Sequence, residues 1–124
     1  MAITRSDFES LSLRDKRKVI EKEYKTISAI IFAECRENGI FSDIGGPLTE
    51  IHHIWSRAQC PKWYVFQEEN LVAISQKLHY VIHNKAYSDM NDAEKTYFDY
   101  FREVKEKLKQ DNDNYNQGIT EDFT

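Results

Sequence analysis

Residues 50–85 read EIHHIWSRAQCPKWYVFQEENLVAISQKLHYVIHNK, and this stretch holds all four histidines of the 124-residue chain. The histidines form two close pairs, His52 with His53 and His79 with His83. Imidazole is a common metal ligand and is easily poised for proton transfer near neutral pH. Two such pairs that converge in space suggest a metal-dependent catalytic site, so we take this stretch as the functional centre of the chain.

The first histidine pair falls in a predicted strand. Residues 48–54 fit the alternation of a strand, which places Glu50 and His52 on one side and His53 on the other. Two neighbouring residues of a regular strand cannot both point at one ion. Either the strand bends at His53, or the two histidines have different roles.

The second pair falls in a predicted helix. Residues 70–74 are short and apolar, begin with an asparagine and predict a second strand after a long connection. From Ser75 the pattern becomes helical, so His79 and His83 lie on one face. Residues four apart on a helix are close enough to share one metal ion.

Long helices are predicted on both sides of this stretch. Signatures of a capping box start at Ser12 and Asn91 and open helices over residues 13–38 and from 92 to about Gln110. Each helix has an apolar stripe, formed by Ile20, Tyr24, Ile27 and Ile31 in the first and by Tyr97, Phe101, Val104 and Leu108 in the second. We expect the second helix to pack on the first or on a second copy of the chain, in a homodimer.

The first helix also carries a basic stripe on a roughly opposite face, formed by Arg14, Lys18, Lys22 and Lys25. Such a stripe is either an ordinary solvated face or a surface that contacts phosphates. The sequence alone leaves both interpretations open.

The charge of the chain is unevenly distributed. The formal net charge is -4, and residues 111–124, which contain four acids and no Lys or Arg, account for all of it. Residues 1–110 are therefore neutral overall and are expected to form a single domain. The acidic tail has little apolar content, so we expect it to be disordered.

The remaining composition indicates a cytoplasmic protein with no membrane association. Cys35 and Cys60 lie far apart and form no CxxC pair, which argues against a disulfide framework or a zinc knuckle. No apolar run approaches the ~20 residues that span a bilayer. The N-terminal residues lack the apolar core of a signal peptide.

Together these residues resemble the HNH nucleases of the ββα-metal (His-Me finger) fold. The order Glu50-Ile51-His52-His53, then Asn70, then HxxxH from His79 to His83 reproduces the family motif over about 36 of the 124 residues. The Glu-x-His-His and HxxxH forms are most similar to colicin and pyocin DNases, and HHIWSR with Pro61, Phe66 and Asn70 is more similar to phage-type HNH nucleases. The implied fold is α+β, with a ββα-metal core at 48–86 between two long helices.

The resemblance implies a role for each motif residue. His52, His79 and His83 would bind one divalent metal ion, and His53 would be the general base that activates water for attack on a phosphodiester. Three further residues would assist: Asn70 by bracing the loop that holds His53, Glu50 by orienting a histidine or an arginine, and Arg57 by clamping the scissile phosphate. Glu50 and Arg57 could equally be ordinary polar residues at a strand start and in a solvated loop.

The implied cofactor is a zinc, nickel, manganese or magnesium ion, and three imidazoles favour the transition metals over magnesium. The expected substrate is double-stranded DNA. Two alternatives stay open: an inert metal-stabilised module that binds nucleic acid or protein, and a nuclease for RNA or branched DNA. The chain lacks the paired CxxC motifs of many family members and the strongly basic charge of colicin DNases.

Overall fold

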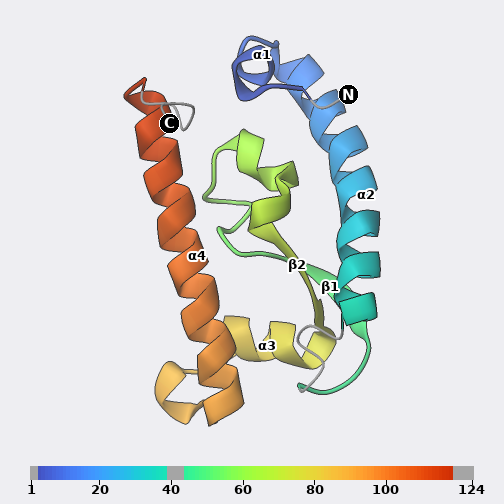
Figure 1. Ribbon diagram of the computed structural model, residues 1–124, viewed down its shortest axis with the longest axis vertical. Coiled ribbons are helices and arrows are strands. Elements are labelled where there is room, and N and C mark those ends of the chain that lie inside the picture. The colour runs from blue at the N-terminus through green and yellow to red at the C-terminus, as the bar shows by residue number, and fades with distance from the viewer. Residues whose placement is uncertain (1–2, 39–43, 119–124) are drawn as a thin grey trace.

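Two long helices, α2 (Leu13–Asn38) and α4 (Asp92–Asn116), flank a two-stranded sheet and its connecting loop in the computed structural model (Figure 1). The structure describes residues 3–38 and 44–118. The remaining elements are, in chain order, α1 (Arg5–Glu9), β1 (Leu48–His53), the 3-10 helices η1 (Lys62–Phe66) and η2 (Glu68–Asn70), β2 (Leu71–Ser75), α3 (Gln76–Asn84) and the 3-10 helix η3 (Tyr87–Asp89). The predicted α+β class is confirmed.

The sheet pairs β1 with β2 in antiparallel register, and His52 lies opposite Val72 and His53 opposite Leu71. Every residue of β2 is buried, whereas buried and partly exposed residues mix along β1. The pairing is irregular only between Leu48 and Glu50, ahead of the histidines. The strand therefore does not bend at His53, and the two histidines point to opposite faces as the alternation predicted.

Ser75 fixes the direction in which α3 leaves the sheet. Its hydroxyl accepts a hydrogen bond from the Leu78 N–H at 3.0 Å and donates one to the Ile44 carbonyl at 2.8 Å. A serine in this position satisfies an otherwise unpaired N–H group of the first helical turn. Leu78 is fully buried, so the first turn of α3 is anchored in the core.

The residues that the structure describes form two hydrophobic core clusters. One joins the two strands to α2, α3 and α4, and the other surrounds the long connection, whose Trp55, Tyr64 and Phe66 are buried. Ile20 and Ile31 of α2 and Phe101 and Leu108 of α4 are also buried, in agreement with the predicted apolar stripes.

The N-termini of both long helices have the predicted caps. Ser12 Oγ accepts a hydrogen bond from the Asp15 N–H at 3.2 Å, and Asn91 and Glu94 form a complete capping box. The predicted end of the first helix at Asn38 is confirmed. The sequence also predicts that the next residue, Gly39, stops this helix, and Gly39 lies outside the described residues. Helix α4, which was expected to pack on α2 or on a second copy of the chain, packs on α3 and η2. The strands and the connecting loop lie between α4 and α2 (Figure 1).

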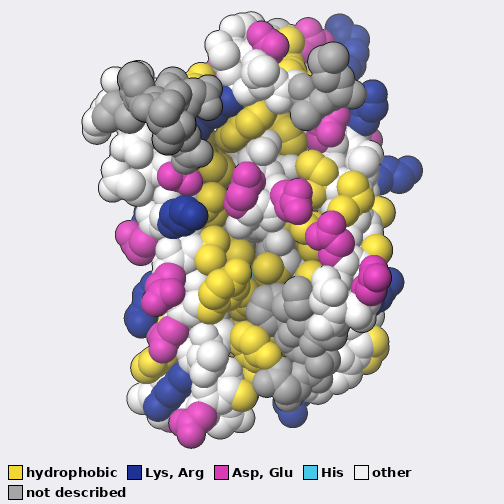
Figure 2. All heavy atoms as spheres, viewed as in Figure 1, with side chains coloured by type: hydrophobic (Ala, Val, Ile, Leu, Met, Phe, Trp, Pro, Cys, Tyr) yellow, Lys and Arg dark blue, Asp and Glu magenta, His cyan; other side chains and the backbone are white. Residues whose placement is uncertain are grey.

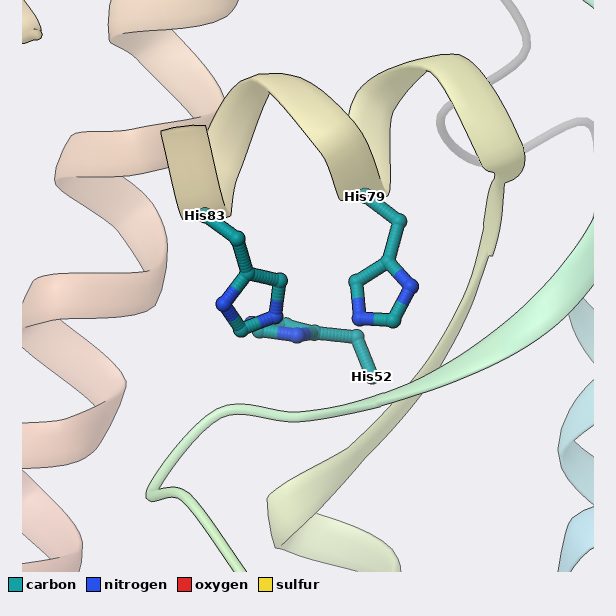
Figure 3. Close-up of side chains that lie close together, drawn as sticks. All are labelled: His52, His79 and His83. Atoms are coloured by element: carbon teal, nitrogen blue, oxygen red, sulfur yellow. The ribbon is translucent and has the colours of Figure 1, made fainter. Parts of the chain in front are cut away.

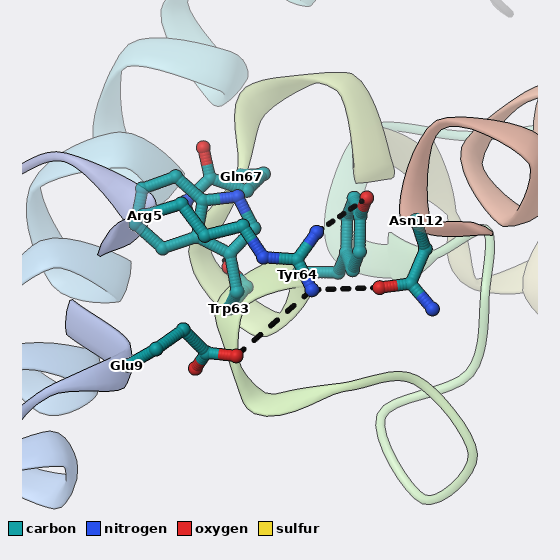
Figure 4. Close-up of polar contacts among 6 residues, drawn as sticks. All are labelled: Arg5, Glu9, Trp63, Tyr64, Gln67 and Asn112. Carbon is teal, nitrogen blue, oxygen red and sulfur yellow. Dashed lines mark hydrogen bonds and ion pairs between the residues drawn. The ribbon is translucent and has the colours of Figure 1, made fainter. Parts of the chain in front are cut away.

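The prediction of a disordered tail from Asp111 is wrong for residues 111–116, which complete α4. Arg5 of α1 donates hydrogen bonds to Asn112 Oδ1 at 2.6 Å and to Tyr64 OH at 3.1 Å (Figure 4). Its guanidinium also lies 3.9 Å from the ring centroid of Tyr115. Polar and cation–π contacts therefore hold this end of the helix, which a count of apolar residues misses.

Two other sequence-based expectations concern the described residues. In that part of the chain, no helix combines the length and the apolar character needed to cross a membrane. Cys35 and Cys60 are both buried and unpaired. Ahead of β1, Gly45 and Gly46 have φ values of 26° and 89°, which favour glycine.

Candidate metal centre

Three of the four histidines converge on one point between β1 and α3. His79 and His83 project from α3 toward His52 on β1 (Figure 3). One ring nitrogen from each residue lies within 4.8 Å of those of the other two. The ring planes meet at 68–75°, so the rings approach edge to face rather than stacking. The set predicted from sequence is thus brought together by the fold.

The donor set fits a transition-metal ion. Two imidazole nitrogens bound to one tetrahedral zinc ion at about 2.1 Å lie about 3.4 Å apart, so the three nitrogens, which lie within 4.8 Å of one another, would move closer together to bind one ion. His52 is 5% exposed, and its Nδ1 is buried without a hydrogen-bond partner among the described residues. A buried polar nitrogen without a partner is costly, and coordination of a metal ion by His52 Nδ1 would remove that cost.

The surroundings of His52 and His79 favour the neutral forms of these two rings. The pKa of His52 is lowered to about 3. Burial is the main cause, and the charges of the neighbouring His79, His83 and His53 contribute the rest. Burial and His83 also lower the pKa of His79, while Glu50 raises it. A neutral imidazole keeps a lone pair on one nitrogen, which metal binding requires.

His53 has different surroundings, on the opposite face of β1. Its Nε2 lies 3.0 Å from the Val65 carbonyl oxygen, and its ring stacks on Tyr24 of α2 with centroids 5.5 Å apart and an interplanar angle of 13°. A carbonyl oxygen can only accept a hydrogen bond, so Nε2 carries the hydrogen and Nδ1 of the neutral ring keeps the lone pair. His53 is therefore held in one orientation and in one tautomer.

The pKa of His53 is lowered, chiefly by burial. The hydrogen bond to Val65 acts in the opposite direction, and the charge of Arg57 lowers the pKa further. The ring is consequently neutral at pH 7, the state in which an imidazole can accept a proton.

The two kinds of histidine meet at one cavity of about 260 Å³ between β1, α3 and α4. His52, His53 and His83 line it, together with Phe101, whose ring centroid lies 5.3 Å from that of His52. Two of the three convergent histidines, His52 and His83, therefore border the same space as His53. This shared access is what a metal ion and a base need in order to act on one reacting atom.

Asn70 braces the loop that follows β1. The residue is fully buried, and its Oδ1 accepts a hydrogen bond from the Trp55 N–H at 2.6 Å. Its Nδ2 donates to the carbonyls of Trp55 and Tyr64, both at 3.0 Å. Tyr64 directly precedes Val65, whose carbonyl contacts His53, so these bonds hold the backbone next to that carbonyl. The contacts expected of Asn70 are present.

The other two predicted residues are less closely tied to the histidines. Glu50 raises the pKa of His79 through its charge, but no hydrogen bond joins Glu50 to a described side chain. Arg57 lines a neighbouring cavity rather than the one that the histidines share, and its guanidinium lies 5.5 Å from the ring centroid of Tyr24.

Sequence reasoning missed the residues that complete the site from other elements. Tyr24 was assigned to the apolar stripe of α2, where it is the one member with a polar group, and Phe101 was assigned to the stripe of α4. Arg102 and Lys105 of α4 also line the histidine cavity. Their spacing along α4 follows one helix face, but no local signal in the sequence connects that face with the histidines.

Comparisons of the chain with protein-family models, with characterised proteins and with solved structures found no match. The function is therefore inferred from the geometry of the histidines and of the side chains around them.

Proposed function

We propose that this chain is a metal-dependent endonuclease of the HNH type, with β1, β2 and α3 as its ββα-metal core. The observation that carries the proposal is the division of the histidines. Three converge with their nitrogens within 4.8 Å of one another, and the fourth borders the same cavity in a separately fixed orientation.

His52, His79 and His83 are proposed to hold one divalent ion, which when bound would stabilise the charge that develops on the phosphate and on the leaving oxygen. His53 accepts a proton through Nδ1 from the water that attacks phosphorus. The Val65 carbonyl and the Tyr24 ring keep the base in position, so little orientational freedom is lost when substrate binds.

The ligand types favour particular metals. Imidazole suits zinc, nickel and other transition ions, whereas magnesium prefers oxygen ligands in octahedral geometry. Glu50 acts on His79 through its charge and is proposed to be an outer partner of the metal ligands. We therefore expect zinc, nickel or manganese to support activity better than magnesium.

His53 also distinguishes a catalytic metal site from the alternative, a metal site that only stabilises the fold. A structural site needs three or four ligands and no oriented base beside an open cavity. Here the ring next to the ligands is neutral, held by a backbone carbonyl and bordered by a cavity. These features support catalysis, and a phosphodiester of DNA is the substrate that we propose.

Cleavage assays test the proposal. The purified chain is incubated with plasmid DNA, a branched junction and RNA across a panel of divalent metals, and the same is done with His53→Ala and with Asn84→Ala, an exposed asparagine on α3. We expect the native chain to cleave plasmid DNA. The cleavage rate should fall by roughly 10²–10⁴-fold in His53→Ala, which is the usual cost of losing a general base, and should be unchanged in Asn84→Ala. Full activity in His53→Ala, or no cleavage of any substrate by the native chain, would refute the proposal.

A further inference from the structure

A second and larger cavity, of about 610 Å³, lies between α2 and the loop that follows β1. Its charged lining consists of three cations, Arg17, Arg57 and Lys62, and one carboxylate, Glu21, which gives a formal charge of +2. The chain as a whole carries a formal charge of -4. The local excess of positive charge is therefore a property of this cavity and not of the overall composition.

Two residues connect this cavity with the proposed base. Tyr24 and Val65 both line it, and the same two residues contact His53, Tyr24 by stacking and Val65 through its carbonyl. The guanidinium of Arg57 lies over the Tyr24 ring and is near enough to lower the pKa of His53. The cationic cavity is thus a direct neighbour of the histidine cavity, separated from it by the contacts that hold His53.

We propose that this cavity binds a backbone phosphate of the DNA strand, next to the phosphate that is cleaved. The inference rests on the proposed nuclease function. Arginine matches the oxygens of a phosphate with paired donors, and lysine supplies a point charge. Contacts with phosphates fix the position of a protein on DNA without reading the sequence, so a site of this kind sets the register of the strand relative to His53.

The distribution of charge around the histidines favours a polyanion over a single small anion. Arg102 and Lys105 of α4 line the histidine cavity, so cations border His53 from α4 as well as from α2 and the loop. The face drawn in Figure 2 shows no histidine and carries acidic side chains over its middle, which would repel a polyanion. The two cavities that border the contacts of His53 are thus both lined by cations.

Two double variants with the same change in net charge test the site. Arg17→Gln with Lys62→Gln removes two cations from the cavity, and neither residue is part of the proposed catalytic machinery. Lys107→Gln with Lys109→Gln removes two cations of α4 that line neither cavity and serves as the control. The affinity for a fluorescent DNA duplex is measured by anisotropy in chelator, between 50 and 200 mM salt, after circular dichroism has shown that both variants fold.

The cavity is proposed to hold one phosphate, and each neutralised phosphate contributes about 1 to the slope of log affinity against log salt, so we expect the slope to become less steep by about 1 in the cavity variant. The control should keep the native slope. Glu21→Gln removes the one carboxylate of the cavity and should tighten binding. A control that weakens binding as much as the cavity variant, or no tightening in Glu21→Gln, would overturn the proposal.

The same samples separate this proposal from the nuclease proposal. If the native chain cleaves DNA and the cavity variant keeps the native slope, the cavity proposal is wrong and the nuclease stands. If the cavity variant loses DNA affinity but no metal supports cleavage by the native chain, the cavity is confirmed as a DNA site and the nuclease proposal fails. Displacement of the duplex by inorganic phosphate as effectively as by unlabelled DNA, at matched ionic strength, would assign the cavity to a small phosphate and refute our inference.

Discussion

Replacing Asn70 with alanine should be one of the most destabilising single changes at the site. The side chain is fully buried, and three hydrogen bonds join it to the backbone of Trp55 and Tyr64. In Asn70→Ala the Trp55 N–H and the carbonyls of both residues lose these partners. Trp55 is itself buried, so its N–H cannot turn to water without movement of the loop.

The size of the effect follows from these three bonds. A hydrogen bond of this kind contributes about 1 kcal/mol, and a buried group left without a partner costs more, so the loss in Asn70→Ala is about 3 kcal/mol. A domain of this size has an unfolding free energy of about 5–15 kcal/mol, so the variant still folds. At about 3–4 °C for each kcal/mol, the melting temperature falls by about 10 °C.

Urea and thermal unfolding of Asn70→Ala and of a matched control measure this directly. Asn84 on α3 makes one hydrogen bond, from its Nδ2 to the Tyr80 carbonyl at 3.0 Å, in an exposed position. Asn84→Ala should change the unfolding free energy by no more than about 0.5 kcal/mol, as is usual for a surface substitution. A loss in Asn70→Ala that does not exceed the loss in Asn84→Ala would refute the view that Asn70 braces this loop.

Three further predictions concern other parts of the chain. Truncation after Gln110 removes two partners of Arg5, namely Asn112 and Tyr115, so the melting temperature should fall. Hydrogen bonds from the Asn91 N–H and from Lys85 lower the pKa of Glu94 in the folded protein. The ionised carboxylate therefore stabilises the fold at a pH above the pKa that Glu94 has in the unfolded chain. This stabilisation is lost as the pH falls through the lower pKa of the folded state. Glu94→Gln should therefore be less stable than the native chain at pH 7 and lose less stability between pH 7 and acid, as followed by urea midpoints. The basic stripe of α2 is exposed, so changing three of its residues together to glutamine should make the salt dependence of DNA binding less steep by roughly 1 log-log unit for each lost contact. These residues are Lys18, Lys22 and Lys25.

Each of these three predictions would be contradicted by a specific result. A truncated chain as stable as the native one would mean that the contacts of Arg5 contribute nothing measurable. Equal acid dependence in Glu94→Gln and in the native chain would show that the capping box is not the source of the pKa shift. An unchanged salt slope after the triple substitution would return the stripe to an ordinary solvated face, without affecting the separate cavity beside His53.

The helices and strands could largely be predicted because local residues determine them. The cap at Ser12 and the apolar periodicity predicted α2 over its observed length, and the alternation around His52 predicted β1 to within one residue. Asn70 was assigned to the second strand but ends η2 instead. Its N–H bonds to the Gln67 carbonyl and its side chain to Trp55, so the residue forms the turn before β2.

The convergence of His52, His79 and His83 could be predicted from two periodicities, the period of two in a strand and the four-residue spacing on a helix. Other parts of the site depend on contacts between distant segments. Tyr24 reaches His53 only because α2 packs beside the connecting loop, and no pattern local to either residue indicates this. The position of Arg57 beside Tyr24 has the same origin.

The end of α4 shows the same limit in another form. The acidic composition after Asp111 indicated disorder, but it could not show that Arg5, more than a hundred residues earlier, lies beside Asn112 (Figure 4). It also could not show that the Arg5 guanidinium lies over the ring of Tyr115. A few polar contacts over a long sequence separation are enough to extend a helix whose own composition is unfavourable. Composition measures the average tendency of a segment and not its tertiary partners.

Calorimetric titration of zinc or nickel into the four single histidine-to-alanine variants tests the division of the histidines most directly. His52→Ala, His79→Ala and His83→Ala each remove a ligand, so the affinity for metal and the stabilisation that metal confers should both fall. His53→Ala should bind metal as the native chain does, because its ring faces Tyr24 and Val65 instead of the other three histidines. A loss of metal affinity in His53→Ala as severe as in His83→Ala, or a native chain that binds neither ion, would contradict this account.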